Sequence, residues 1–390
     1  MKIKDCIGKF EIISAPDEHF FFGYYDLQPY DSKEERHLAH KVKFRDRLPD
    51  KNDVCELGYI DLKTREFVKL AETTAWNFQQ GALLQWYKDD DHIVYNVRTG
   101  EDSFGTQILN IVTGEKRTLP LACANISKDG KYGLCVNMSR IFDFRPGYGY
   151  SDVPDPYYNQ NTPNDDGIFL MDMETGEYKL LLSYKQIAET FPEKPFSDEK
   201  LVVNHITFNP SGTRFMFLLR NFPREDVPWD TQFITSDLDG NMYLMTNYVR
   251  NSHYHWKNDT EILMMSSHNC DLQNDYQLRT DLQEEYISYD YPETHDTDIH
   301  CLFNPDTRYF SGDAYPDSER YRGLYLYDTL KNKATLLVNV YSYKDSCIDI
   351  RCDLHARWNP SGTKLSFDSN HTGYRCICEL DIEDIIKNND

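Results

Sequence analysis

The chain has 390 residues, of which 64 are acidic and 42 basic, so its formal net charge is −22 at pH 7. This balance argues against the basic surface that nucleic acid binding needs, and equally against a polybasic membrane-surface protein. No apolar run approaches the roughly 20 residues of a transmembrane helix, and the first residues lack the apolar stretch of a secretory signal. Ten cysteines in such a chain are typical of reduced thiols. We therefore expect a cytoplasmic protein that binds neither nucleic acid nor membranes.

A short repeated phrase indicates the fold. In each copy a strand ends in a hydrophobic residue and Asp, once Asn, and a polar turn follows. The seven copies begin at Gly58, Ile108, Ile168, Phe233, Tyr276, Leu324 and Cys376. Each unit corresponds to a small antiparallel sheet of about four strands, which cannot bury both of its faces alone. The repeats therefore predict an all-β chain, a seven-bladed β-propeller of four-stranded antiparallel blades, with residues 1–390 as one domain.

A second phrase, an aromatic residue followed by a tight turn and a strand, precedes most copies, as in Phe208-Asn-Pro-Ser-Gly. The mean repeat of about 56 residues (390/7) exceeds the ~40–45 residues of a compact blade. The surplus lies in two insertions, residues 137–167 and 182–202. Few segments have the periodicity of a helix, and the best candidates are residues 183–191 and 382–387.

Four histidines share one position in this pattern, three residues before the aromatic residue of the second phrase. They are His205, His253, His300 and His355, and the same position in earlier blades holds Leu83 and Cys123. Equivalent positions of successive blades form a ring around the axis of a propeller. A ring of imidazoles suits a divalent metal or proton transfer. The alternative is that these histidines only brace neighbouring blades by hydrogen bonds.

Two carboxylates add to the first interpretation. Asp298 and Asp353 each lie two residues before a histidine of the column, and we expect them on the same strand face as that histidine. Sets of two histidines and a carboxylate suit a catalytic divalent metal better than a closed structural site. His255, two residues after His253, is expected to be a bystander or a substrate contact. Cys376 and Cys378 share a strand face, but no second Cys/His pair follows at zinc-ribbon spacing, so we expect no structural zinc there.

The last repeat, Asp353-Leu-His355-Ala-Arg-Trp-Asn-Pro-Ser-Gly, resembles the last blade of the oligogalacturonate lyases, which are cytoplasmic seven-bladed propellers with a metal-assisted lyase activity. The segments that begin at Ser252, His300, His19 and Asn77 also resemble parts of that family. The chain is similar as well to a group of bacterial proteins with the phrases His-Phe-Phe-Gly-Tyr-Tyr-Asp, Trp-Asn-Phe-Gln-Gln-Gly and Arg-Cys-Asp-Leu-His.

The resemblance implies roles for the histidine column. His253 corresponds to the catalytic base of the family and His300 to a metal ligand. His355 and Asp353, together with His205, would complete a site for a divalent metal ion, manganese by resemblance. The family has two histidines where this chain has Asp353 and His355, and its nearby glutamine ligand falls at residue 350 or 351, which are Ile and Arg.

The arginine that assists catalysis in the family falls near Thr231 or Gln232 in this chain. We expect Arg220 or Arg224, from an adjacent strand or loop, to take its place. Aromatic residues of the 137–167 insertion and of the segment 20–25 are expected to stack on sugar rings.

These features predict a metal-assisted lyase that cleaves an acidic, uronic-acid-containing oligosaccharide by β-elimination inside the cell. No Gly-x-Ser-x-Gly elbow and no Gly-rich nucleotide motif occurs, so a serine peptidase and a nucleotide cofactor are not indicated. Two alternatives remain. One is a non-catalytic propeller that binds a glycan or a protein, and the other is a metal-dependent hydrolase or epimerase in polysaccharide metabolism.

Overall fold

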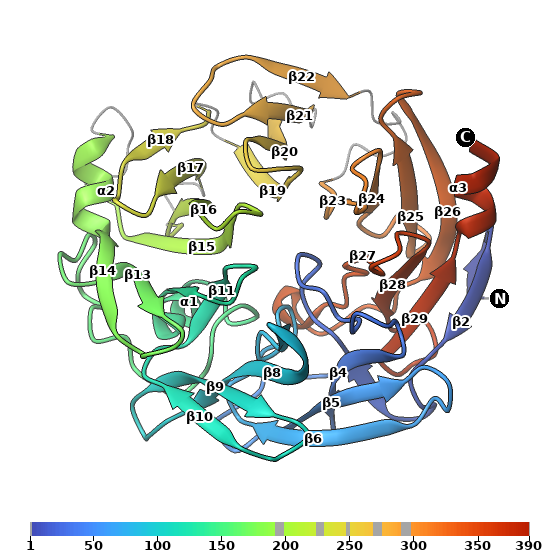
Figure 1. The fold of residues 1–390 in the computed structure, drawn as a ribbon, viewed down its shortest axis with the longest axis horizontal. Coiled ribbons are helices and arrows are strands. Elements are labelled where there is room, and N and C mark those ends of the chain that lie inside the picture. Colours follow the sequence, from blue (N-terminus) through green and yellow to red (C-terminus); the bar gives the residue numbers. More distant parts are fainter. Residues whose placement is uncertain are drawn as a thin grey trace.

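Each of the seven repeated phrases forms the third strand of an antiparallel sheet, and the seven sheets surround one central axis (Figure 1). The computed structural model describes residues 2–191, 199–223, 230–246, 250–267, 275–289 and 298–389. The middle strands of the blades are buried over most of their length and the outer strands are more exposed, because neighbouring sheets pack on one another. The chain is thus a seven-bladed β-propeller, as the repeats predicted.

The strands of each blade follow one another from the axis outwards. The first blade has β3 (His19–Phe21), β4 (Arg36–Val42), β5 (Cys55–Asp61) and β6 (Phe67–Thr73). The second has β7 (Gln85–Tyr87), β8 (Asp89–Arg98), β9 (Phe104–Asn110) and β10 (Lys116–Leu119). The third has β11 (Cys123–Ile126), β12 (Tyr132–Cys135), β13 (Gly167–Asp172) and β14 (Tyr178–Ser183). The fourth has β15 (Leu201–Phe208), β16 (Arg214–Asn221), β17 (Thr231–Asp237) and β18 (Met242–Leu244).

The last three blades contain both ends of the chain. The fifth has β19 (Arg250–Trp256), β20 (Glu261–Ser267), β21 (Asp275–Thr280) and β22 (Tyr286–Tyr289). The sixth has β23 (Leu302–Phe303), β24 (Tyr309–Asp313), β25 (Tyr321–Asp328) and β26 (Lys333–Tyr341), with β1 (Ile3–Lys4) added outside. The seventh has β27 (Arg357–Trp358), β28 (Lys364–Ser369), β29 (Cys376–Asp381) and, outermost, β2 (Lys9–Ile12). The pairing of β2 with β29 closes the ring by backbone hydrogen bonds.

In the described residues, the α-helices lie in the insertions and at the C-terminal end. α2 (Tyr184–Thr190) and α3 (Glu383–Asn389) confirm the two predicted helices. α1 (Met138–Phe144) was not predicted and lies in the 137–167 insertion, where the Asn137 side chain accepts a hydrogen bond from the backbone of Arg140 and caps the helix. A short 3₁₀ turn covers Ile348–Ile350. Among the described helices, none has the length and apolar character needed to cross a membrane.

The innermost strands are kinked where the histidine column lies. Leu83, His205 and His355 have φ angles of 54°, 53° and 46°, in the left-handed region that residues with a side chain adopt rarely. The ladder of β15 slips in register around His205, and that of β19 slips between residues 251 and 254, around His253. Such bulges change the direction of a side chain, and here they share one position in successive blades.

The first blade departs from this plan. Its innermost ladder stops after Phe21 and resumes at an isolated bridge at Tyr30, so residues 22–29 lie opposite only two residues of β4. The extra residues form a loop that reaches toward the axis and is drawn in blue near the centre of Figure 1. We call residues 22–29 the axial loop.

A buried carboxylate holds the axial loop. Asp368, on β28, accepts hydrogen bonds from the backbone N–H groups of Phe22 at 3.0 Å and Gly23 at 3.2 Å. The same carboxylate binds the buried guanidinium of Arg357 at 2.9 Å. Gly23 has φ 120°, and a Cβ there would meet the backbone of Gln80 at 2.9 Å, so only glycine fits.

Replacing Asp368 with Ala should lower the free energy of unfolding by about 3–5 kcal/mol, because Arg357 then stays buried without its counter-ion. Chemical denaturation measures this loss. Asp61→Ala is the matched control, since Asp61 also accepts two backbone hydrogen bonds but at a peripheral turn, and its effect should be much smaller. Equal losses in the two variants would show that the Asp368–Arg357 pair does not stabilise the axial loop.

Candidate active site

His253 is oriented by a carboxylate of the following blade. Its Nδ1–H donates to Asp298 Oδ1 at 2.8 Å, and the Ser252 hydroxyl donates to the other oxygen of that carboxylate. Burial lowers the pKa of His253 below its usual value, and Asp298 offsets only part of this effect. The ring is therefore neutral at pH 7, with the proton on Nδ1 and a lone pair on Nε2.

Asp298 does not have the partner that the sequence predicted. We expected it on a strand face shared with His300, but residues 298–301 are not in a strand, because β23 begins at Leu302. The carboxylate turns to His253 of the preceding blade instead. Burial alone would raise the pKa of Asp298, but the His253 ring and the Ser252 hydroxyl outweigh burial and lower it.

His300 and His355 face each other through their Nε2 atoms, which lie 3.2 Å apart. His300 Nδ1 donates to Asp313 Oδ1 at 2.7 Å, and His355 Nδ1 donates to the backbone carbonyl of Gly23 at 2.9 Å. Both partners can only accept, so Nδ1 carries a proton in each ring and Nε2 is the nitrogen left to bind a cation. Two such nitrogens thus face each other in a buried place, which a cation between them or beside them would stabilise.

Asp353 completes this group. Ligand atoms of His300, Asp353 and His355 all lie within 4.8 Å of one another, and all three residues are buried. Burial and the neighbouring His300 lower the pKa of His355 well below its usual value, which favours the neutral ring that a metal ion needs. The donor set of two imidazoles and a carboxylate fits a divalent cation.

Two arginines already bind the Asp353 carboxylate. Arg322 Nη1 lies 2.6 Å from Asp353 Oδ1, and Arg351 Nε lies 2.6 Å from Oδ2 without the alignment of a hydrogen bond. Burial would raise the pKa of Asp353, but Arg351 and Arg322 hold it well below its usual range. This carboxylate is therefore ionised, and its Oδ2 has room for a further partner.

His205 is not part of that group, and the Tyr24 ring contacts both His205 and His355. Its ring stacks on Tyr24 with centroids 4.6 Å apart and planes 9° from parallel, and its Nε2 lies 3.1 Å from the Tyr24 hydroxyl. Gln80 Nε2 lies 3.5 Å from the other ring nitrogen. The centroids of the His205 and His253 rings are 6.4 Å apart. His205 is thus a neighbour of His253, and its role as a metal ligand stays a prediction.

A cavity of about 460 Å³ opens beside His253. Its lining includes Asp298, His205, Tyr148, Tyr315 and three arginines, Arg145, Arg220 and Arg351. The centroid of the His300 ring is 4.0 Å from that of His253, so the group of His300, Asp353 and His355 lies directly behind this wall. A buried imidazole, three arginines and a set of potential cation ligands therefore lie close together.

Arg220 contributes a charge to this cavity. Its Nη1 donates to Asn204 Oδ1 at 2.8 Å, which fixes the guanidinium on the innermost side of β16. Burial and the nearby Arg145 lower the pKa of Arg220 to about 10, so it remains charged at pH 7. Thr231, where the sequence comparison placed the family's arginine, lines the same cavity. Arg224 lies outside the described residues.

The 137–167 insertion supplies part of the wall. Arg140 in α1 is fully buried, pairs with Asp155 at 3.1 Å and donates to five backbone-carbonyl or carboxylate oxygens, so it anchors the insertion. Beyond the helix, Arg145 and Tyr148 enter the cavity, and the Tyr148 hydroxyl accepts a hydrogen bond from Arg351 at 3.0 Å. Tyr150, by contrast, is buried against Asn96 at 2.9 Å, away from the lining.

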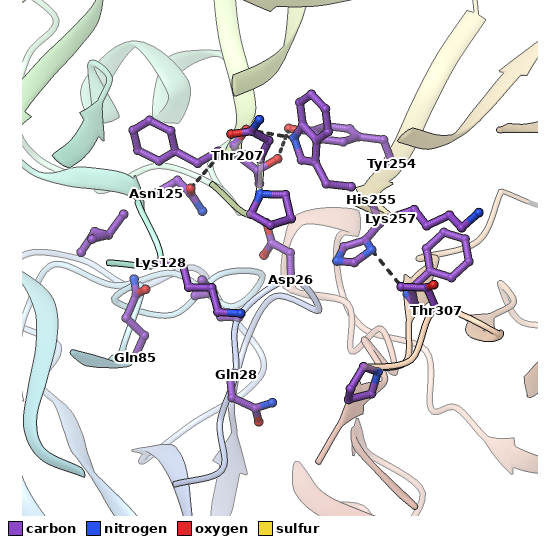
Figure 2. A pocket seen from close by; sticks show the side chains of 18 of the residues that line it. Asp26, Gln28, Gln85, Asn125, Lys128, Thr207, Tyr254, His255, Lys257 and Thr307 are labelled. Carbon is purple, nitrogen blue, oxygen red and sulfur yellow. Dashed lines mark hydrogen bonds between the residues drawn. The ribbon is translucent and has the colours of Figure 1, made fainter. Parts of the chain in front are cut away.

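A second cavity of about 380 Å³ lies at the other end of the innermost strands (Figure 2). Asp26, Lys128, His255 and Lys257 line it, together with the hairpin turns. His253, two residues from His255, lines the first cavity instead, so the two histidines serve opposite ends of the axis. His255 therefore does not contact a substrate bound beside His253.

The roles of Tyr24 and Asp313 in positioning the site were not predicted from the sequence. Tyr24 was expected, with the other aromatic residues of the segment 20–25, to stack on sugar rings, but the aromatic side chains of that segment are buried. Its pairing with His205 escaped the alignment because the axial loop breaks the repeat in the first blade. Asp313, which orients His300, could have been found, since Asp313 and Asp368 each follow the Asn of an Asn-Pro turn by nine residues. Asp313 also accepts the backbone N–H of His355 at 2.9 Å, so one carboxylate supports both histidines.

Comparison with known proteins supports the fold and leaves the chemistry open. No protein-family model matches the sequence, and no curated protein matches it either. Among solved structures, the oligogalacturonate lyase of Vibrio parahaemolyticus is 14% identical, with a TM-score of 0.70 over 98% of this chain and 95% of that one. An oligogalacturonate lyase in complex with manganese is also 14% identical, with a TM-score of 0.72 over 99% and 96% of the two chains.

Propellers of other functions are similar as well. The β-propeller domain of the Trilobed protease from Pyrococcus furiosus is 11% identical, with a TM-score of 0.53 over 93% of this chain and 96% of that domain. The chain therefore resembles the oligogalacturonate lyases in fold over its whole length, as the sequence suggested. At this identity the comparison shows the fold alone, and the site must carry the functional argument.

The facing nitrogens of His300 and His355 predict a cation site that can be measured. Protein dialysed against Mn²⁺ should retain the ion, and His300→Ala/His355→Ala should lose it, because the two imidazole donors are gone. Metal analysis of both preparations gives the result. His255→Ala is the matched control, and it should retain as much Mn²⁺ as the unsubstituted protein. Equal content in the double variant would contradict the site.

Proposed function

We propose that the chain is a metal-assisted lyase that cleaves a uronic-acid-containing oligosaccharide by β-elimination. One observation carries the proposal. The His253 base, held by Asp298, forms the wall between an arginine-lined cavity and the buried group of His300, Asp353 and His355. β-Elimination next to a carboxylate needs these three parts: a base, a cationic place for the carboxylate, and stabilisation of the charge that develops.

The arginines of the cavity account for binding. Arg145, Arg220 and Arg351 line a volume large enough for sugar residues. Guanidinium groups pair with carboxylates through two parallel hydrogen bonds, which orient a uronic acid as well as attract it. The rings of Tyr148 and Tyr315 offer flat surfaces to the same volume. An acidic oligosaccharide is therefore the substrate class that this lining fits.

His253 performs the proton transfer. Its Nε2 accepts the proton from the carbon next to the substrate carboxylate, and the C–H electron pair forms a double bond to the neighbouring carbon. The C–O bond to the leaving sugar breaks, and the departing oxygen takes a proton from water. Asp298 stabilises the imidazolium that forms, because its carboxylate already accepts the Nδ1–H bond. The α-proton of a carboxylate is feebly acidic, so charge stabilisation must accompany this step.

A divalent metal would supply that stabilisation. His300, His355 and Asp353 would hold it, and when bound it neutralises negative charge that develops on the substrate carboxylate. Arg322 and Arg351 keep Asp353 ionised for this purpose. A manganese complex of a structurally similar lyase supports a divalent ion of this kind. Location in the cytoplasm stays a prediction.

The reaction products separate this proposal from its alternatives. Elimination leaves an unsaturated sugar that absorbs in the ultraviolet, whereas hydrolysis leaves a saturated, shortened chain. Epimerisation changes a stereocentre without cleavage, and a non-catalytic propeller binds its ligand unchanged. The protein is therefore incubated with a panel of uronides, the ultraviolet absorbance of an unsaturated product is followed, and the products are analysed by mass spectrometry. A saturated or uncleaved product would overturn the lyase.

His253→Ala should lower turnover at least ~10²-fold, since the variant lacks the general base. The Mn²⁺ content should not change, because His253 is not part of the metal-binding group. His255→Ala, on the same strand but at the other cavity, is the control and should keep full turnover. If His253 only braces its blade, the variant will be less stable but fully active, and that result would remove the residue from the mechanism.

Arg220→Ala should lower kcat/KM by at least about tenfold, mainly through a higher KM. A hydrogen bond to a charged group contributes about 1.5–3 kcal/mol, which corresponds to this range. Arg220→Lys keeps the charge without the planar guanidinium, so its kcat/KM should lie between those of the unsubstituted protein and Arg220→Ala. Arg117→Ala, at a peripheral strand where the side chain donates to two backbone carbonyls, controls for lost charge. A folded Arg220→Ala protein with unchanged KM would contradict the assignment.

A further inference from the structure

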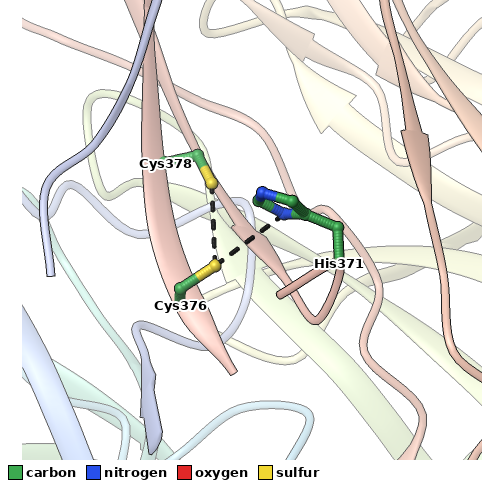
Figure 3. A group of neighbouring side chains, drawn as sticks. All are labelled: His371, Cys376 and Cys378. Atoms are coloured by element: carbon green, nitrogen blue, oxygen red, sulfur yellow. Dashed lines mark hydrogen bonds between the residues drawn. The ribbon is translucent and has the colours of Figure 1, made fainter. Parts of the chain in front are cut away.

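A second group of metal-ligand side chains lies in the seventh blade, away from the axis (Figure 3). The sulfur atoms of Cys376 and Cys378 are 3.9 Å apart, and His371 Nδ1 is 3.9 Å from the Cys376 sulfur. One ligand atom of each residue lies within 4.8 Å of the others, and all three residues are buried. Neither the proposed lyase chemistry nor the cation site of His300 uses these side chains.

The local fold brings the three together. Cys376 and Cys378 alternate along β29, so both side chains point to the same face of the blade. The turn between β28 and β29 then returns His371 over that face, where Ser369 Oγ lies 2.8 Å from its Nδ1. The two sulfurs join the apolar cluster between the sixth and seventh blades. Water is excluded on that side, while Thr372 and Tyr374 in the same turn reach solvent.

The distances fit a tetrahedral ion better than a disulfide. Two sulfurs bound to zinc at roughly 2.3 Å in tetrahedral geometry lie about 3.8 Å from each other. A disulfide needs about 2.05 Å between its sulfurs, whereas the sulfurs of Cys376 and Cys378 are 3.9 Å apart.

We propose that His371, Cys376 and Cys378 form a second metal site, one for Zn²⁺. Two thiolates and an imidazole are soft and borderline donors, which suit zinc. The group of His300, Asp353 and His355 has no sulfur and suits harder divalent ions. The chain would therefore separate two metals by ligand type. This proposal departs from the expectation of no structural zinc, which rested on zinc-ribbon spacing, because the third ligand precedes the cysteines in a turn.

Zinc at this place would stabilise a turn that supports the active site. Arg375, next to Cys376, donates to the backbone carbonyls of Ile350 and Arg351, the latter at 3.0 Å. Asn370 receives the Tyr343 N–H at 2.9 Å and donates to its carbonyl at 3.1 Å. The turn thus holds the backbone of Arg351, whose side chain lines the cavity. The ion would act on structure, one step away from the chemistry.

The experiment uses the full chain with His300→Ala/His355→Ala, so that the axial site cannot contribute. Co²⁺ serves as the probe, since thiolates bound to it give charge-transfer bands in the near ultraviolet. One equivalent of Co²⁺ should produce these bands, and Zn²⁺ should remove them. Adding Cys376→Ser or Cys378→Ser should weaken metal binding by more than the roughly 10–100-fold that an outer-shell partner costs.

Cys123→Ser is the matched control. Cys123 and Cys135 form another buried sulfur pair, 3.7 Å apart, with Met173 sulfur rather than an imidazole beside Cys123. This variant should keep the bands. If the serine variants of Cys376 and Cys378 fail to fold, alkylation of the unsubstituted protein decides, because Zn²⁺ should protect these two thiols in peptide mapping.

Several results would overturn the second site. The Co²⁺ bands could be absent, or they could survive in a folded Cys376→Ser protein. Zn²⁺ could fail to protect the two thiols from alkylation, or Cys376 and Cys378 could form a disulfide in reducing buffer. None of them bears on lyase activity, which is measured separately on the unsubstituted protein. Failure of the zinc site and failure of the proposed function are therefore distinguishable.

Discussion

The ion pair of Asp368 and Arg357 is the interaction on which the axis of this propeller depends. Asp368 holds the axial loop through two backbone N–H groups, and the loop in turn presents the Gly23 carbonyl to His355. That carbonyl fixes the proton of His355 on Nδ1 and leaves Nε2 toward His300. One buried carboxylate therefore determines, through the backbone of the axial loop, which ring nitrogen of His355 can bind a cation.

The same logic joins the other blades. Asp298 of one blade orients His253 of the preceding one, and Asp313 orients His300 while accepting the backbone N–H of His355. Each histidine is thus fixed by a neighbouring segment rather than by its own strand. Such a site exists only in the closed ring, so the pairing of β2 with β29 has a functional as well as a structural consequence.

The spacing of the sequence repeats predicted the features that recur in every blade. These are the seven blades, the third strand of each blade, and the common position of His205, His253, His300 and His355. It could not predict pairings set outside the period. Asp298 was assigned a strand face where no strand exists, and Asp353 meets Arg322 across a loop that no spacing describes. The pairing of Tyr24 with His205 was missed for a similar reason, because the axial loop interrupts the register at the blade where the chain begins.

The charge around the cavity is opposite in sign to the net charge of the chain. The chain carries a formal charge of −22, yet Arg145, Arg220 and Arg351 line one cavity together with a single carboxylate, Asp298. Screening at physiological salt limits the field of distant acidic groups to about 8–10 Å, so a ligand in the cavity senses mainly the arginines. An anionic sugar would therefore bind through these local contacts rather than by long-range attraction. Its binding would depend on how firmly the guanidinium groups are held in place. Arg351 is held in place by Asp353, by the Tyr148 hydroxyl and by Arg375 in the turn that follows His371. That turn therefore supports both the cavity and the group of His371, Cys376 and Cys378.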